Sequence, residues 1–134
     1  MPNVRIKDAA ALLGVSDDTV RRWVDSGALA ASKDDSGRKV IAGEVLAEFA
    51  RDHAAPPPDP LGVGSSARNR FVGLVTKVTA DKVMCEVQMQ CGPFTVVSLM
   101  SSESARQLGL TPGALAVAVV KATNVIVETP GGTS

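Results

Sequence analysis

The strongest constraint on the fold is a proline-rich segment near the middle of the chain, because the spacing of apolar residues differs on its two sides. The segment reads Ala54-Ala55-Pro56-Pro57-Pro58-Asp59-Pro60. Successive prolines lack N–H donors and favour an extended polyproline conformation, so neither a helix nor a sheet continues through them. Apolar residues recur at helical spacing before this segment and at every second position after it. The sequence therefore predicts two small domains, over residues 1–54 and 65–134, joined by a linker over residues 55–64.

Charge and size bound the possible partners. The formal net charge is zero, and residues 1–55 hold eight Lys or Arg against nine Asp or Glu. This balance excludes a strongly basic nucleic-acid binder but leaves room for a local basic strip, because electrostatic steering depends on where charges sit. Domains of about 55–65 residues bury little core and are often stabilised by association, so we expect a homo-oligomer.

The spacing of the two cysteines limits the expected compartment. The lack of membrane-spanning, catalytic and metal-binding motifs limits the expected class of protein. Cys85 and Cys91 lie six residues apart on one expected strand, which separates their Cα atoms by about 20 Å, too far for a disulfide. We expect both to be buried thiols in a reducing compartment. With no leader sequence and no apolar run of membrane-spanning length, we expect a cytoplasmic protein without membrane contact. No nucleophile–base pair or metal-ligand cluster is visible, so we do not expect an enzyme.

The first half predicts two helices around a tight turn, followed by a hairpin and a third helix. Apolar residues at helical spacing run up to Gly14, which is suited to a left-handed helix end. Ser16 is a good N-cap for a second helix over residues 17–26, which stops at Gly27. Short extended segments over 29–32 and 38–42 flank an Asp- and Gly-containing turn, and residues 44–53 form the third helix.

This half resembles the MerR and excisionase families of DNA-binding proteins. The resemblance rests on Ala-Ala-x-Leu-Gly-Val-Ser over residues 10–16, Thr-Val-Arg-Arg-Trp over residues 19–23, and the following Gly27. It implies a winged helix-turn-helix domain whose helix 17–26 enters the major groove of DNA. The expected DNA contacts come from the second helix and the wing: Ser16, Thr19, Arg21, Arg22, Lys33, Arg38 and Lys39.

A plainer interpretation of the same helix stays open. Three Asp–Arg pairs lie four residues apart within residues 17–25, and such pairs also make a solvated helix face with no partner. Trp23 shares the face of Val20, so we expect it in the core and not stacked on a base. Because one such domain covers a short DNA site, useful affinity would require a dimer.

The second half predicts a small OB-like β-barrel with one short helix. Strands are expected over residues 71–78, 83–91, 94–100, 115–120 and 125–128, and a helix over residues 102–108. The fold class is therefore α+β with two domains, a winged helix-turn-helix followed by an OB-like barrel.

Small polar and cationic residues in this half resemble the molybdate-binding Mop domain, also described as the molbindin or TOBE type. The resemblance rests on Ser66-Ala67-Arg68-Asn69, on the serines of 101–104, and on Lys121-Ala122-Thr123, in this order and spacing. It implies a molybdate or tungstate site at subunit interfaces of a dimer or hexamer, which Ser66–Arg68 reach across the subunit boundary. The implied site residues are Ser66, Ala67, Arg68, Ser101, Ser104, Lys121, Ala122 and Thr123.

These residue types suit a tetrahedral dianion. Such a ligand needs hydroxyl and N–H donors from several directions and little counter-charge. Ser101 and Ser104 would flank a helix N-terminus, where backbone N–H groups are free, while Lys121 adds a point charge and Arg68 a planar fork. Taken singly, the two serines are explained as helix caps and Lys121 as a surface lysine. Their combination favours an oxyanion site.

The two halves together predict a molybdate- or tungstate-responsive transcriptional regulator. Such a protein is similar in logic to ModE regulators but has a different DNA-binding domain. Two alternatives remain at this point. One is a molbindin-like molybdate or tungstate storage protein, and the other is a DNA-binding protein whose barrel serves only oligomerisation.

Overall fold

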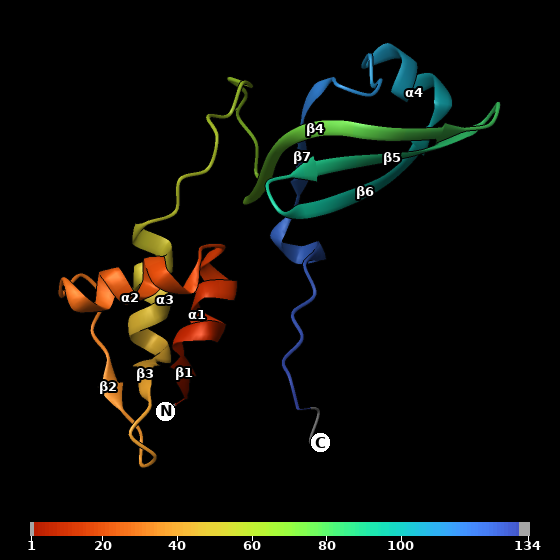
Figure 1. The fold of residues 1–134 in the computed structure, drawn as a ribbon. Helices are drawn as coiled ribbons and strands as arrows, with labels where there is room; N and C mark the ends of the chain where they lie inside the picture. The colour runs from red at the N-terminus through yellow and green to blue at the C-terminus, as the bar shows by residue number, and fades with distance from the viewer. Residues whose placement is uncertain (1, 132–134) are drawn as a thin grey trace. The chain divides into compact units, whose positions relative to one another are not determined.

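A computed structural model describes residues 2–131 and divides the chain into two compact units, with the boundary between Ala55 and Pro56 (Figure 1). The N-terminal unit contains three helices and a small sheet, and the C-terminal unit contains a larger sheet with one short helix. No helix in this described range is long and apolar enough to cross a membrane.

The N-terminal unit is a helix-turn-helix with a wing. Its elements are β1 (Asn3–Arg5), α1 (Ile6–Leu13), α2 (Asp17–Asp25), β2 (Ser32–Lys33), β3 (Lys39–Ala42) and α3 (Gly43–Asp52). The three strands form an antiparallel sheet in the order β1-β3-β2. Gly14 ends α1 with a left-handed φ of 71°, and the Ser16 side chain accepts a hydrogen bond from the Thr19 N–H at the start of α2. Both helix-boundary predictions are confirmed.

The core of this unit comes from one face of each helix and from β3. Its fully buried members include Ala9, Val20 and Ile41, with Leu29 from the loop before β2. Trp23 packs against this core, with its ring centroid 4.9 Å from that of Phe49. The prediction that Trp23 belongs to the core is therefore confirmed.

The C-terminal unit is a curled antiparallel sheet. Its elements are β4 (Asn69–Ala80), β5 (Met84–Cys91), β6 (Phe94–Ser101), α4 (Ser102–Gln107), β7 (Leu115–Val120) and the 3₁₀ turn η1 (Ala122–Asn124). The strand order is β6-β5-β4-β7. The first half of β4 pairs with β7 and its second half with β5, with a register shift between Val75 and Lys77. The long β4 curves across both partners, as Figure 1 shows.

The core of this unit follows the two-residue alternation of β5. Cys85, Val87, Met89 and Cys91 are buried on one face, together with Val75 of β4 and Ala105 of α4. Both cysteines are free and buried, as the sequence predicts, and burial raises the pKa of the Cys91 thiol.

One predicted strand is absent among the described residues. We expected residues 125–128 to form the fifth strand of a small OB-like barrel, but this segment pairs with no strand. The sheet is an open half-barrel, in which β6 and β7 each have one strand neighbour. The alternation of the segment is compatible with a strand, but a strand also needs a partner edge, which a local pattern does not specify.

Candidate functional site

The N-terminus of α2 carries a network of hydrogen bonds between predicted DNA-binding residues. The Ser16 and Thr19 hydroxyls lie 3.0 Å apart, and Arg22 Nη2 donates to Thr19 Oγ1 at 3.1 Å. The α2 helix begins here because the Ser16 Oγ accepts from the Thr19 N–H. The structure thus brings the side chains of Ser16, Thr19 and Arg22 together on one surface of α2, the helix that the sequence predicts to enter the major groove.

The acidic residues of α2 pair differently from the four-residue spacing that the sequence offers. Arg21 Nη1 lies 3.4 Å from Asp18 Oδ1, three residues earlier, and Lys39 Nζ lies 3.7 Å from Asp25 Oδ1. Exposed ion pairs of this kind contribute little to stability, at most about 1 kcal/mol. They matter for the predicted DNA contacts, because Arg21 and Lys39 each form an ion pair with a carboxylate. Arg22 instead donates a hydrogen bond to a neutral hydroxyl.

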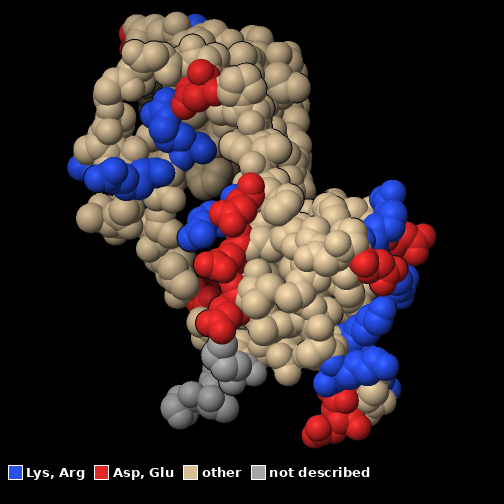
Figure 2. All heavy atoms as spheres, turned by 90° about the vertical axis from the view of Figure 1, so that its left-hand side faces the viewer, with Lys and Arg blue, Asp and Glu red and all other residues tan. Residues whose placement is uncertain are grey.

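The wing is a short hairpin that holds Lys33, Arg38 and Lys39 on its exposed surface. Its turn is fixed by Asp34, whose Oδ1 accepts hydrogen bonds from the Ser36 and Arg38 N–H groups, both at 2.9 Å. The Arg38 N–H bond is the main cause that holds the pKa of Asp34 below its ordinary value. Lys and Arg side chains gather along one edge of this unit, with Asp and Glu side chains among them (Figure 2).

Ser101 and Ser104 meet at the start of α4. The Ser101 Oγ accepts from the Ser104 N–H at 3.1 Å and donates to the Ser104 Oγ at 2.8 Å. Ser101 is exposed and Ser104 is half-buried. The Ser101 hydroxyl therefore caps the helix, while the Ser104 hydroxyl, which accepts from Ser101, has its own proton to donate in the same place.

The other oxyanion residues gather at a different place, where β4 begins and β7 ends. Asn69 pairs with Val120 across the two strands, and Asn69 Nδ2 donates to the Val120 carbonyl oxygen at 3.2 Å. Residues 66–68 come directly before Asn69, and residues 121–123 come directly after Val120. The pairing thus brings Ser66, Ala67 and Arg68 close to Lys121, Ala122 and Thr123.

These two groups lie at opposite ends of β4. Ala80 at its far end pairs with Cys85, and the neighbouring Met84 pairs with Ser101. From Asn69 to Ala80 the path along the strand is about 36 Å, at about 3.3 Å per residue. Figure 1 shows η1 and α4 well apart. One copy of the chain therefore does not bring all eight predicted oxyanion residues together.

The structure adds a partly exposed ion pair, between Arg70 and Asp59, that the sequence reasoning missed. Arg70 Nε donates to Asp59 Oδ2 at 2.7 Å, and Arg70 Nη2 is buried and has no hydrogen-bond partner within residues 2–131. Both side chains are about one quarter to one third exposed. The bond to Arg70 is the main cause that lowers the pKa of Asp59, and the same bond raises the pKa of Arg70. The available signal was an acidic residue within the proline-rich segment, which has no local cation.

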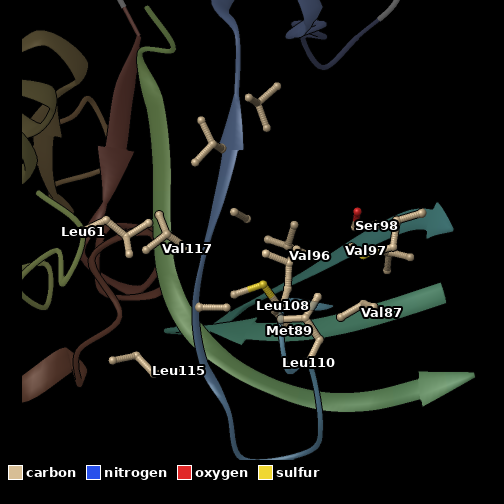
Figure 3. Close-up of a pocket in the computed structure, with 15 residues that line it drawn as sticks. Leu61, Val87, Met89, Val96, Val97, Ser98, Leu108, Leu110, Leu115 and Val117 are labelled. Carbon is tan, nitrogen blue, oxygen red and sulfur yellow. The ribbon is translucent and has the colours of Figure 1, made fainter. Parts of the chain in front are cut away.

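An apolar groove of about 450 Å³ lies on the C-terminal unit (Figure 3). Its walls come from Val96–Ser98 of β6 and Leu115–Val120 of β7, and Val87 and Met89 of β5 line it as well. This lining offers no charged side chain for an oxyanion. Among residues 2–131, no group of three or more His, Cys, Asp or Glu side chains is placed to hold a metal ion.

Comparison with protein families assigns both units. Residues 4–54 match the helix-turn-helix domain, and residues 65–127 match the TOBE domain. No curated protein matches this sequence. The chain therefore carries a helix-turn-helix domain followed by a TOBE domain.

Three solved structures are similar to half of this chain. A molybdate-binding protein from Sporomusa ovata is 28% identical, with a TM-score of 0.48, over 50% of this chain and 100% of its own. MopII from Clostridium pasteurianum is 34% identical, with a TM-score of 0.46, over 49% of this chain and 100% of its own. The cytoplasmic molybdate-binding protein ModG, with molybdate bound, is 39% identical, with a TM-score of 0.48, over 51% of this chain and 49% of its own. All three TM-scores lie below 0.5, so these likenesses alone do not establish the fold.

Proposed function

We propose that this chain, which joins a helix-turn-helix domain to a TOBE domain, is a transcriptional regulator that responds to molybdate or tungstate. The observation that carries the proposal is the presence of both domains in one chain. A DNA reader covalently joined to an oxyanion-binding domain gives the ligand a direct way to alter DNA binding. The proposed oxyanion residues are those of the two groups at the ends of β4.

DNA binding is supported by the exposed arrangement of α2 and the wing. Arg22, in the last turn of α2, donates one N–H to the neutral Thr19 hydroxyl, so its guanidinium has four further N–H donors for a base edge or phosphate. A bidentate contact from arginine to guanine discriminates by about 1–3 kcal/mol. Lys33 and Arg38 on the wing would grip the flanking phosphates, which position the protein without reading sequence.

The oxyanion site is proposed to form between two copies. Ser101 and Ser104 of one copy supply hydroxyl donors at the start of α4. Residues 66–68 and 121–123 of another copy supply Arg68, Lys121 and backbone N–H groups from the far end of its β4. An anion bound by both groups favours the assembled state, because it interacts with that state more strongly than with separated copies. Assembly then sets which pairs of α2 helices can reach DNA together.

The first test is calorimetric titration of the full chain with molybdate, tungstate and sulfate, with the mass followed by light scattering. We expect saturable binding of molybdate and tungstate, but not sulfate, to an oligomer. Arg68→Ala and Lys121→Ala should each weaken binding at least about tenfold, since each removes a charged donor whose hydrogen bond contributes about 1.5–3 kcal/mol. Lys77→Ala, an exposed lysine in the middle of β4, is the matched control and should bind normally.

The second test is selection of DNA sequences by the same protein with and without molybdate. A selected sequence whose affinity changes with molybdate supports the regulator. Saturable oxyanion binding without any selected sequence would instead favour the storage protein. A selected sequence with no oxyanion binding would leave the C-terminal unit as an oligomerisation domain.

A further inference from the structure

Ser102 is the one polar residue that is buried within residues 2–131, with 2% of its surface exposed. It is the first residue of α4 and lies between Ser101 and Ser104, the two serines of the proposed oxyanion site. A buried hydroxyl costs free energy unless it is hydrogen-bonded, and alanine would fill a helical position without that cost. Filling the core therefore does not explain the hydroxyl of Ser102.

Both the hydroxyl and the N–H of Ser102 bind the turn between β4 and β5. The Oγ donates to the Asp81 carbonyl oxygen at 2.7 Å, and the N–H donates to the Val83 carbonyl oxygen at 2.9 Å. The first N–H groups of a helix have no partner within the helix, so the second bond satisfies one of them. Two bonds from one residue thus hold the start of α4 against the end of the sheet where β4 passes into β5 (Figure 1).

The turn that accepts these bonds is closed by the Asp81 side chain. Its Oδ1 accepts hydrogen bonds from the Val83 and Met84 N–H groups, both at 2.8 Å, and the Asp81 N–H donates to the Met84 carbonyl oxygen at 3.0 Å. The bond from Met84 is the main cause that lowers the pKa of Asp81. An Asp side chain that binds backbone N–H groups of its own turn restricts the conformation of that turn. Ser102 is therefore bound to a well-defined point of the sheet.

The two serines of the proposed site belong to different elements, and Ser102 lies at their junction. Ser101 ends β6 and pairs with Met84 of β5, so its position follows from the sheet. Ser104 belongs to α4, a helix of six residues, which is too short to be stable without packing. The buried residues of this helix are Ser102 and Ala105. The bonds of Ser102 therefore help to decide where the Ser104 hydroxyl lies relative to that of Ser101, 2.8 Å away.

We propose that Ser102 is a positioning residue of the oxyanion site, whose hydroxyl holds the Ser104 donor at the place relative to Ser101 that the anion requires. The inference rests on the proposed function and adds to it a residue that does not touch the ligand, since the Ser102 Oγ is buried and donates to Asp81. The donors of a binding site must be held within about 0.5 Å, which packing and supporting hydrogen bonds provide.

The test is calorimetric titration of molybdate into the full-chain variants Ser102→Thr and Ser102→Val. These side chains have the same branched shape, and a cavity of about 380 Å³ that Ser102 lines beside α4 gives room for the added methyl groups. Thr keeps the hydroxyl, whereas Val removes it. We expect Ser102→Thr to bind within about twofold of the wild type and Ser102→Val to bind about tenfold more weakly, the effect of about one hydrogen bond.

Thr76→Val is the matched control. It also removes a hydroxyl that donates to a backbone carbonyl oxygen of the same sheet, that of Gln88 at 3.3 Å. This variant should bind molybdate as the wild type does. Urea unfolding of every variant separates positioning from stability, because the weaker binding of Ser102→Val should be measured under conditions where the protein is fully folded.

A double-mutant cycle tests whether Ser102 acts through Ser104. It uses Ser102→Ala, which removes the hydroxyl and adds no volume. Once Ser104→Ala has removed the donor, Ser102 has nothing to position, so Ser102→Ala should weaken binding in the wild type but no further in the Ser104→Ala protein. The inference would be overturned by equal losses in both backgrounds, by wild-type affinity in Ser102→Ala, or by a loss in Ser102→Thr as large as in Ser102→Val.

Failure of this inference is separable from failure of the proposed function. A wild-type chain that binds no molybdate rejects both, and the titration of the wild type alone shows this. A wild-type chain that binds molybdate, with Ser102→Ala and Ser102→Val binding equally well, retains the oxyanion site and rejects only the positioning role.

Discussion

Arg21 and Arg22 are neighbours on α2, but their guanidinium groups contact different side chains. Arg21 contacts the Asp18 carboxylate, whereas Arg22 contacts only the Thr19 hydroxyl among the described residues. We expect Arg22→Ala to weaken binding to a selected DNA duplex by about 10- to 100-fold, consistent with about 1–3 kcal/mol for an arginine base contact. Arg21→Ala should cost less, because part of its charge is already neutralised by Asp18. Fluorescence anisotropy at fixed salt measures both, and a larger loss for Arg21→Ala would refute this ranking.

Asp59 gives the C-terminal unit a dependence on pH. Its bond to Arg70 lowers its pKa in the folded state from the ordinary value of 3.8. Because the folded-state pKa is the lower one, the pair stabilises the fold above the unfolded-state pKa and loses this effect as pH falls through the folded-state pKa. We expect the Tm of this unit to drop more steeply below about pH 4 than in Asp59→Asn, whose side chain does not titrate. Parallel pH profiles of the two proteins would contradict this role.

The local elements of the fold are largely predictable from particular residues. Ser16 and Gly14 fix the turn between α1 and α2, and the alternation from Cys85 to Cys91 gives β5 and its buried face. These signals are local, since a cap or an alternating face depends on residues within a few positions. The Asp59–Arg70 bond was not predictable, because it joins residues of a linker and a strand through the folded register. The same reason explains why the fifth strand was predicted but is not formed: a strand needs a partner edge, and the residues of the segment itself do not specify that edge.

The same distinction between local spacing and folded register applies to the two candidate sites. The α2 network joins residues 16, 19 and 22, so helical spacing alone brings them together. The predicted oxyanion residues are recognisable as motifs, but their separation into two groups follows from the pairing of β4 with β7 and β5. The family resemblance implies a site between subunits, but motif order along the chain does not contain this register, and so the distance between the two groups becomes evident only from the sheet.

Gly73 of β4 lies so close to β5 that there is no room for a Cβ atom. A Cβ there would lie 2.7 Å from the Cys91 Sγ and would also collide with the Gln90 backbone carbonyl. Backbone cannot swing aside as a side chain can, so we expect Gly73→Ala to destabilise this unit by about 1–3 kcal/mol or more, as overpacking of a tight core does. Urea unfolding measures the change. Gly62→Ala, where a Cβ meets nothing within 4 Å, is the control, and an equal effect of both substitutions would show that the close approach is unimportant.

The linker is the covalent connection through which the proposed regulator would pass a change in one domain to the other. Its second part is tied to the C-terminal unit, because Asp59 binds Arg70 of β4 close to Arg68. Only residues 54–58 remain between the C-cap of α3, His53, and this tie, and three of these five are proline. A polyproline segment acts as a semi-rigid spacer, whereas Gly/Ser segments behave as flexible coils. In the proposed regulator, the geometry of two copies that share an oxyanion would pass through this short spacer to the α2 helices.

Replacing residues 54–58 with a Gly/Ser segment of equal length, while keeping Asp59, should therefore uncouple the two activities. We expect molybdate titration and DNA binding each to persist, while the ratio of DNA affinities with and without molybdate falls toward one. A control replacement with an Ala/Pro segment of equal length should preserve most of that ratio, because it keeps the stiffness and changes the sequence. Anisotropy titrations of the three proteins on one duplex measure the ratio. An unchanged ratio in the Gly/Ser protein would mean that coupling passes through assembly alone, with the linker acting only as a tether.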